Sequence, residues 1–336
     1  MYNQGHCIHK CLRSIQNQSL KNIEIIIIDD CSLDNSTKII EEYQKEDDRI
    51  ILLKHESNEG KIKTRTDGIK IAKGKYITIV DGDDAFIHRN ILYNSLYIAK
   101  FANLDIVEFK GSYYKKGKFI KNINNYEIIN ISNIIYQPEL RTKFFYIKEN
   151  DSIRAIQSRC IWGKLIKNKI FQKALINIGK KYTDDYILTY EDTIMMVAIY
   201  QIAQSYFLMK QVGYYYSRDE FSNRLPIKKN KKCKPNGKIR NIGQVKLLQF
   251  LVEKTRNDEI ERQMLYHEII SINYYSKFYR IINSQFEEMY SIYDTIINSQ
   301  FISEKQKKRI KLLKTQLKSK EKKLYFKNIT TNNSNK

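Results

Sequence analysis

Three acids directly follow an apolar segment of this 336-residue chain. Asp81, Asp83 and Asp84 come at the end of the apolar run 76–80, in the order Asp-Gly-Asp-Asp. Carboxylates this close repel one another unless a positive charge lies between them, and a hard divalent cation with oxygen ligands is the usual solution. We therefore predict that Asp83, Asp81 and Asp84 bind Mn²⁺ or Mg²⁺, and that this cation can in turn hold a diphosphate.

Strand-like and helix-like patterns alternate before and after these acids. Such alternation predicts βαβ units in an α/β fold with a mostly parallel sheet. Ligands of open α/β sheets collect at the carboxyl ends of the strands, so the place of Asp81 agrees with its predicted chemistry. We expect strands at 23–28, 50–53, 76–80 and 105–109, and helices ending near 44 and spanning 61–72 and 91–102.

The rest of the chain predicts a second, helical part. The pattern weakens over 113–160, which we interpret as a variable insertion bordering the site, and order resumes at Trp162. The acids Glu191 and Asp192 open a predicted helix that ends near 204. We predict four segments: a catalytic α/β domain at 1–225, a basic linker at 226–238, a helical region at 239–327 and a disordered polar tail at 328–336.

Composition narrows the class of protein. A hydrophobic fraction of 42% can fill a core, and five cysteines in a chain of this size indicate free thiols in a reducing compartment. The net charge is +22, but lysine is abundant along the whole chain and nucleic-acid-binding motifs are absent from the sequence, so we expect no nucleic acid as partner. We expect a cytoplasmic protein and leave peripheral contact with a membrane open.

Several motifs occur in an order that resembles the family 2 glycosyltransferases, whose catalytic domain has the GT-A fold. The resemblance runs from Tyr2 to about Arg224 and rests on several segments together. The matching segments are Tyr2-Asn3, Cys11-Leu12-Arg13-Ser14-Ile15 with Gln18, Ile28-Asp29-Asp30-Cys31-Ser32-Leu33-Asp34, Asn58-x-Gly60, Arg65 with Gly68, Ala72-x-Gly74, Asp81-x-Asp83-Asp84, Trp162-Gly163-Lys164-Leu165 and Glu191-Asp192.

This resemblance implies a reaction and a role for each site residue. The reaction is transfer of a sugar, with inversion, from a nucleoside diphosphate sugar, UDP being the common family choice, to a hydroxyl of a glycan, glycolipid or polysaccharide precursor. Asp192 would be the general base. Asp29, Asp30, Arg65, Asp81 and Asp83 would bind the donor, and Asp83, Asp81 and Asp84 the Mn²⁺ or Mg²⁺ that stabilises the leaving diphosphate.

Simpler explanations exist for four residues of these motifs. Glu191 and Asp192 also favour the start of a helix through its dipole, and Asp30 also suits a helix cap. Arg65 suits a phosphate, one of the aspartates, or an ordinary place on a helix surface.

The chain also departs from the family pattern. The family has a full apolar strand before the Tyr-Asn pair, whereas this sequence starts at Met1, and Arg65-Thr66-Asp67 replaces the common Arg-Asn-x. The missing strand makes a truncated or non-catalytic relative the main alternative, and a basic polyanion-binding protein is a third. The sequence does not identify the donor sugar, the acceptor, the linkage, the oligomeric state or the role of the C-terminal helices.

Overall fold

The computed structural model describes residues 1–115, 118–122, 134–140, 147–149, 152–154, 159–217, 242–254, 262–263, 265–266, 269 and 286–333. The chain forms two compact units. Unit 1 comprises Met1–Lys148 with Arg154–Lys234, and unit 2 comprises Glu149–Ile153 with Pro235–Lys336. The division near residue 234 falls within the predicted linker, which itself lies outside the described residues.

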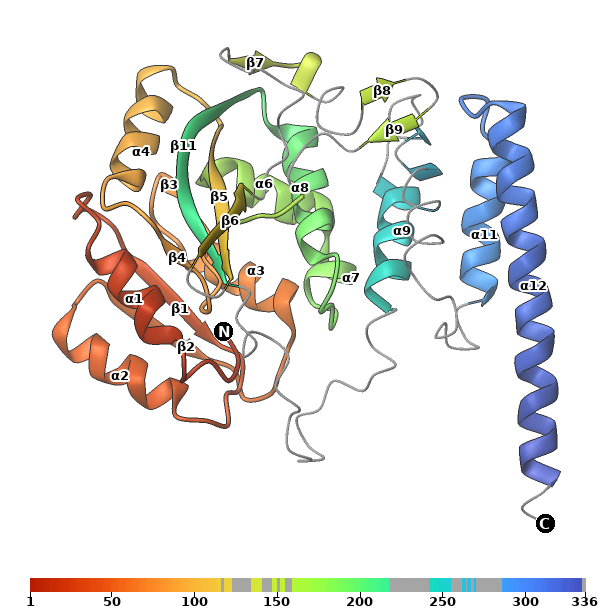
Figure 1. Cartoon of the computed structure of the whole chain (residues 1–336), viewed down its shortest axis with the longest axis horizontal. Helices are drawn as coiled ribbons and strands as arrows, with labels where there is room; N and C mark the ends of the chain where they lie inside the picture. The colour runs from red at the N-terminus through yellow and green to blue at the C-terminus, as the bar shows by residue number, and fades with distance from the viewer. Residues whose placement is uncertain are drawn as a thin grey trace. The chain divides into compact units, whose positions relative to one another are not determined.

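Unit 1 begins with a parallel pair of strands covered by helices (Figure 1). Strand β1 pairs with β2 in the register Ile25 to Ile50, and apolar side chains of α1 and α2 pack with those of both strands. The predicted strands and the helix between them are confirmed, with small shifts of their ends. The elements are α1 (Ile8–Gln16), β1 (Ile25–Asp29), α2 (Ser36–Glu46), β2 (Ile50–Lys54) and α3 (Lys61–Ile71).

A seven-stranded sheet forms the rest of the core of unit 1. Its strands lie in the order β3-β10-β5-β11-β4, with β6 beside β5 and β7 beside β11. The members are β3 (Tyr76–Ile77), β4 (Ala85–Phe86), β5 (Ile106–Lys115), β6 (Lys118–Asn122), β7 (Ile135–Tyr136), β10 (Lys164–Lys167) and β11 (Ser205–Ser217).

The expectation of a mostly parallel sheet is wrong for this larger sheet. Only β5 and β11 run parallel among its described pairs, and the other pairs are antiparallel. Antiparallel neighbours need no crossover helix, so the alternation of strand and helix patterns in the sequence does not specify their direction. Most of 113–160, the predicted variable insertion, lies outside the described residues.

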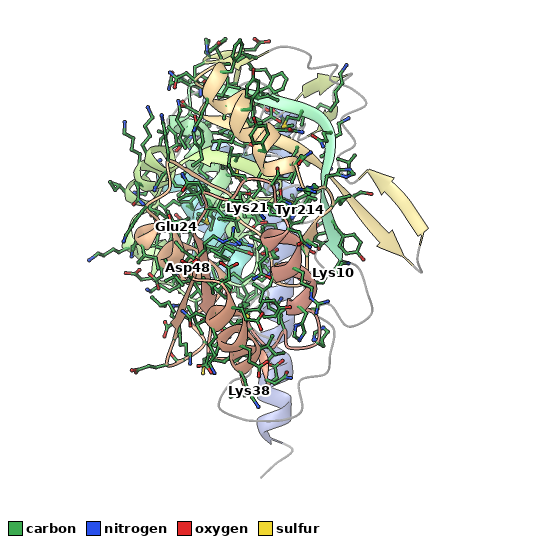
Figure 2. All side chains as sticks on the ribbon, turned by 90° about the vertical axis from the view of Figure 1, so that its left-hand side faces the viewer. Lys10, Lys21, Glu24, Lys38, Asp48 and Tyr214 are labelled. Atoms are coloured by element: carbon green, nitrogen blue, oxygen red, sulfur yellow. The ribbon has the colours of Figure 1, made fainter. Side chains whose placement is uncertain are left out.

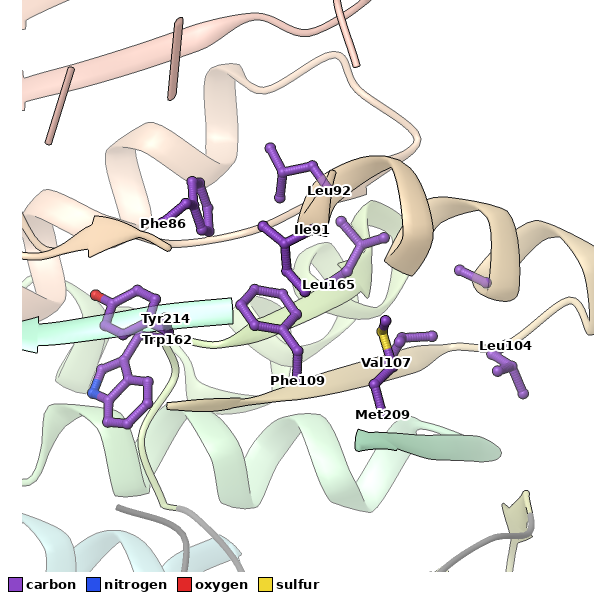
Figure 3. Packing of buried hydrophobic residues seen from close by; sticks show 11 residues of the cluster. Phe86, Ile91, Leu92, Leu104, Val107, Phe109, Trp162, Leu165, Met209 and Tyr214 are labelled. Carbon is purple, nitrogen blue, oxygen red and sulfur yellow. The ribbon is translucent and has the colours of Figure 1, made fainter. Parts of the chain in front are cut away.

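Helix α4 (Ile91–Phe101) packs on one face of this sheet and closes an apolar core (Figure 3). Side chains from α4, β5, β10 and β11 meet there, including Ile91, Phe109 and Trp162. A methyl group at Gly213 would lie 2.3 Å from Ile91 and 2.8 Å from Phe109, so glycine permits this close approach of α4 to β11. The remaining helices of unit 1 are α6 (Asn168–Ile178), α7 (Lys180–Thr183) and α8 (Glu191–Ile202).

The described residues of unit 2 beyond residue 235 are mainly helical. Helix α11 packs against α9 and α12, and their apolar positions are buried, among them Leu248 and Ile310. Helix α12 continues through 328–333, where the sequence predicts a disordered tail. The helices are α9 (Ile242–Lys254), α11 (Phe286–Ile297) and α12 (Glu304–Asn333). Strands β8 (Ile147–Glu149) and β9 (Ser152–Arg154) pair with each other in a short two-stranded sheet. Among the described helices, none combines the length and apolar character needed to cross a bilayer.

Charged side chains are dispersed over unit 1. Lys10, Lys21 and Lys38 lie apart on the face shown in Figure 2, with Glu24 and Asp48 among them. The labelled charges of this face thus include both signs. The cysteines in the described segments, Cys7, Cys11, Cys31 and Cys160, are free thiols, as predicted.

Candidate active site

Arg65 connects the two acidic motifs that the sequence singles out. It lies on α3 with only 9% of its side chain exposed. Its Nη2 donates to Asp81 Oδ1 at 3.0 Å, and its Nη1 donates to Glu191 Oε1 at 3.2 Å and to Asp192. Of the three explanations that the sequence leaves open for Arg65, pairing with an aspartate is the one that these contacts show. Asp81 and Asp192, which are 16 and 127 positions from Arg65 in the sequence, thus meet at one guanidinium.

The charges of this cluster depend strongly on one another. Burial disfavours the charged guanidinium, but Asp192, Asp81 and Glu191 together raise the pKa of Arg65 well above its ordinary value. Burial, followed by the neighbouring Asp192, raises the pKa of Glu191 to about 7. Lys61 adds a second cation, with its Nζ 3.7 Å from Glu191 Oε1. Arg65 is therefore the charge that allows the acids to lie together in a poorly solvated place.

The acids Glu191 and Asp192 open helix α8, and an unusual backbone conformation precedes them. Tyr190, the residue before the helix, has φ 66°, in the left-handed region that tyrosine rarely adopts. Glu191 is buried, whereas 23% of the Asp192 side chain is exposed. Helix start and site therefore coincide, so the simpler explanation by the helix dipole and the catalytic one are compatible.

Asp84 is held entirely by strand β11. Its Oδ2 accepts a hydrogen bond from the Tyr214 hydroxyl at 2.7 Å, and its Oδ1 accepts one from the Ser217 backbone N–H at 2.8 Å. Burial, then Asp81 and Asp83, raise the pKa of Asp84 to about 8. This carboxyl group therefore anchors the acidic turn to the sheet through contacts that the sequence did not predict.

The other two acids of the turn differ in their surroundings. Burial raises the pKa of Asp81, but Arg65 and then Lys61 outweigh it and hold that pKa below its ordinary value. Burial, followed by Asp81, raises the pKa of Asp83. Of these two acids, Asp83 is thus the one whose ionised form would gain more from a nearby cation.

The donor atoms of this turn fit a cation that is shared with a ligand. No group of three His, Cys, Asp or Glu side chains in the described segments is arranged to hold a metal by itself. Mg²⁺ is commonly bound through one or two carboxylates together with substrate phosphates, and Asp81 and Asp83 supply such a pair. The predicted third ligand, Asp84, already accepts two hydrogen bonds from the protein.

The second acidic turn, at the end of β1, is fixed by hydrogen bonds of its own. Asp29 accepts from the Ser32 backbone N–H at 3.0 Å and from the Thr37 hydroxyl. Asp30 accepts from His55 Nδ1 at 2.8 Å and from the backbone N–H groups of Glu59 and Gly60 at 2.8 and 3.1 Å. A carboxylate has about four acceptor positions, so these bonds leave Asp29 two and Asp30 one.

The segment around Trp162 supports the site from beneath. The Trp162 indole stacks on the Tyr214 ring with a centroid distance of 4.6 Å. The Tyr214 hydroxyl also accepts a hydrogen bond from the Asp81 backbone N–H at 3.2 Å. Lys164 is fully buried and lies 3.1 Å from Glu108, so its described contacts belong to the core of the sheet.

Comparisons with known proteins agree with these motifs. The family model "Glycosyl transferase family 2" matches residues 1–156. Glycosyltransferase GlyG of Streptococcus pneumoniae serotype 4 is 29% identical over 189 residues, which cover 55% of this chain and 60% of GlyG. The N-terminal part of the chain is therefore similar to glycosyl transferase family 2. Poly(ribitol-phosphate) beta-glucosyltransferase of Bacillus spizizenii is 27% identical over 219 residues, 64% of this chain and 31% of that enzyme.

The fold of the chain also has solved counterparts. The crystal structure of S. aureus TarS 1-349 in complex with UDP-GlcNAc superposes with a TM-score of 0.59 at 15% identity, covering 91% of this chain and 80% of TarS 1-349. The expected GT-A type fold is therefore confirmed. The chain spans less than two thirds of the length of the two curated relatives described above.

Several residues of the candidate site were not predicted from the sequence. His55 lies between two acids, with its Nε2 3.3 Å from Asp67 and its Nδ1 on Asp30. Lys61 and Tyr214 were likewise not assigned to the site. An amphipathic pattern gives no signal for such contacts, because it shows which face of an element is buried and not which distant residue meets it.

Proposed function

We propose that this chain is a metal-dependent, inverting glycosyltransferase that uses a nucleoside diphosphate sugar, with UDP as the nucleotide. The observation that carries the proposal is the contact of Arg65 with both Asp81 and Asp192, because it brings the predicted donor and base motifs together. The match of residues 1–156 to the family 2 model and the GT-A fold support the same reaction class. The TarS complex contains UDP-GlcNAc, which supports a uridine nucleotide.

The nucleoside half of the donor would bind at the end of β1. Asp29 and Asp30 are buried and fixed, and each keeps acceptor capacity for a ligand N–H or O–H. A preorganised carboxylate needs little rearrangement to accept a hydrogen bond from a ligand. We therefore assign these two acids to the base and ribose of the nucleotide. We assign the loop at Glu59 and Gly60, which Asp30 holds through backbone hydrogen bonds, to the same binding region.

The diphosphate half would lie near Arg65 and the acidic turn. Asp83 and Asp81 would hold the divalent cation, with Asp84 assisting by anchoring the turn to β11. When bound, the cation supplies positive charge that stabilises the leaving diphosphate. Arg65 donates its N–H groups in a planar fork that matches phosphate as well as carboxylate oxygens, so it can orient the diphosphate.

Asp192 would be the general base. Direct displacement at the anomeric carbon needs a group that accepts the proton of the attacking hydroxyl, and Asp192 is the more exposed acid of the pair at the start of α8. Glu191 lies deeper and holds Arg65 and Lys61 in place. We assign the acceptor hydroxyl to a glycan, glycolipid or polysaccharide; the name of the Bacillus spizizenii relative supports a surface polymer.

The experiment is slow hydrolysis of UDP-sugars, in which water replaces the acceptor. Release of UDP is measured with Mn²⁺, and the anomer of the released sugar is read by NMR before it mutarotates. We expect an inverted anomer. Asp192→Asn should lower the rate by roughly 10²–10⁴-fold. The control is Asp184→Asn, because Asp184 is an exposed acid close in sequence and should be neutral. A retained anomer, or equal rates for both variants, would contradict the assignment.

A further inference from the structure

Helix α4 carries three aromatic side chains on its outer surface. Tyr93, Tyr97 and Phe101 follow one another at intervals of four residues, and 53%, 61% and 83% of these side chains are exposed. Residues four apart lie on one side of a helix, so the three rings form a stripe. The rings of Tyr97 and Phe101 stack with a centroid distance of 6.2 Å and an angle of 13°. We call these three residues the α4 stripe.

The opposite side of α4 is apolar as well. Ile91, Leu92 and Ala99 are buried in the core beneath the helix (Figure 3). A helix of a soluble domain usually has a polar outer face, whereas α4 presents aromatic rings outward in addition to its buried apolar face. The α4 stripe therefore indicates a surface that another body covers when the protein works.

No other described element concentrates exposed apolar side chains in this way. The remaining large apolar residues that are exposed in the described segments occur one per element, which is normal for a protein surface. They are Leu33, Ile51, Ile71, Tyr136, Ile176 and Leu312. The α4 stripe is thus a local feature and not the result of an unusually apolar surface.

The charged residues that lie near the α4 stripe in the sequence are all basic. Arg89, four residues before Tyr93, and Lys100, beside Phe101, are exposed. Lys21 is also exposed, two residues from Ser19, whose backbone N–H donates to the Arg89 carbonyl at 2.7 Å. From residue 85 to 104 the sequence has no Asp or Glu. The outer surface of α4 therefore combines aromatic rings with cations, and the helix itself contributes no acidic side chain.

We propose that α4 docks unit 1 on the surface of a membrane that contains anionic lipids. Aromatic rings favour the interface between headgroups and acyl chains, and nearby Lys and Arg side chains gain energy from anionic headgroups. A second copy of the chain is a poor occupant, because each copy has a net charge of +22 and the stripe offers cations to cations. This docking is independent of the proposed reaction.

The test is co-sedimentation of the full chain with lipid vesicles at 0.1 M salt. One set of vesicles contains phosphatidylcholine alone and the other contains 30% phosphatidylglycerol. We expect binding to the anionic vesicles at least tenfold stronger than to the neutral ones. Tyr93→Gln/Tyr97→Gln/Phe101→Gln should weaken binding roughly tenfold or more, since the rings supply the inserted apolar area. If this variant is unfolded by circular dichroism, the single Phe101→Gln variant decides the outcome.

Two controls separate the α4 stripe from other surfaces. Ile176→Gln removes an equally exposed apolar side chain from α6 and should leave binding unchanged. Lys308→Glu/Lys311→Glu removes exposed cations from α12, the other basic surface, and should weaken binding less than Arg89→Glu/Lys100→Glu does.

Three results would overturn the proposal. The first is absence of binding by the folded full chain, and the second is binding that depends on α12 and not on α4. The third is a concentration-dependent dimer in analytical ultracentrifugation that the triple α4 variant abolishes, which would identify a second copy as the occupant.

Discussion

Replacing Arg65 by methionine tests the electrostatic centre of the site. The substitution keeps an apolar stem of similar length but leaves Asp81, Glu191 and Asp192 without the cation that they share. Removing one partner of a buried ion pair typically costs about 3–5 kcal/mol. Asp81 and Asp192 retain 31% and 23% exposure, so water screens part of the repulsion and we expect about 3 kcal/mol at pH 8.

The cost of Arg65→Met should depend on pH through Glu191. Its pKa is raised from 4.5 to about 7, mainly by burial, so the folded state binds this proton more tightly than the unfolded state. Stability from this group is fully present below pH 4.5 and is lost as pH rises through 7. Arg65 lowers this pKa, so in Arg65→Met the pKa of Glu191 should rise further, and the variant should lose more stability than the native chain between pH 5.5 and pH 8. At pH 5.5, where Glu191 is protonated, the variant should therefore be destabilised by only about 1 kcal/mol.

The assay is urea unfolding at pH 5.5 and pH 8 in the presence of EDTA, so that no divalent cation replaces the missing charge. Arg13→Met is the matched control, because Arg13 is exposed on α1 and, within the described part of the chain, its side chain donates only to the Tyr43 hydroxyl at 3.3 Å. It should change stability by less than about 0.5 kcal/mol. Adding Glu191→Gln to Arg65→Met should restore part of the loss at pH 8. A loss of equal size at both pH values would refute the reasoning.

Three further substitutions test how the site is supported. Gly111→Ala would place a methyl group 2.6 Å from the Trp162 indole, so it should destabilise the chain by about 1–3 kcal/mol in urea unfolding. Gly68→Ala, which meets only ordinary contacts from 3.4 Å within helix α3, should instead stabilise it by up to about 1 kcal/mol, and a loss there would show that α3 packs more tightly than described. Tyr214→Phe leaves Asp84 without one of its two hydrogen-bond donors and should cost about 1–3 kcal/mol, measured by the shift in melting temperature; an unchanged stability would show that Asp84 is supported by other groups.

Much of the fold could be predicted because its signals are local. The apolar run at 23–28 and the helical spacing at 61–72 each report burial of one element, and both elements formed within a few residues of the expected ends. The tail beyond 328 was predicted as disordered from its polar composition, yet α12 continues to Asn333. Helix formation is cooperative, because adding a residue to an existing helix is easier than starting a new one. A helix can therefore extend into a segment whose composition alone does not predict it.

The site was predictable as a set of residues but not as an arrangement. The motif order placed Arg65, Asp81 and Asp192 in the same site, and the structure joins them. The fixation of Asp84 by Tyr214 could not be read from the sequence, because it depends on β11 lying antiparallel to β4 in one register. Strand direction and register are set by long-range pairing and leave no mark on a single strand.

The most direct test of the proposed function is a thermal-shift titration with UDP, with and without Mn²⁺. The chain is compared with its Asp83→Ala variant and with a control, Asp48→Ala, which removes an exposed acid far from the motif in sequence. Ligands that bind only the folded state raise the melting temperature. The account predicts a rise with UDP that needs Mn²⁺ and is lost in Asp83→Ala but kept in Asp48→Ala. A folded chain whose melting temperature does not respond to UDP, GDP or their sugars would contradict it.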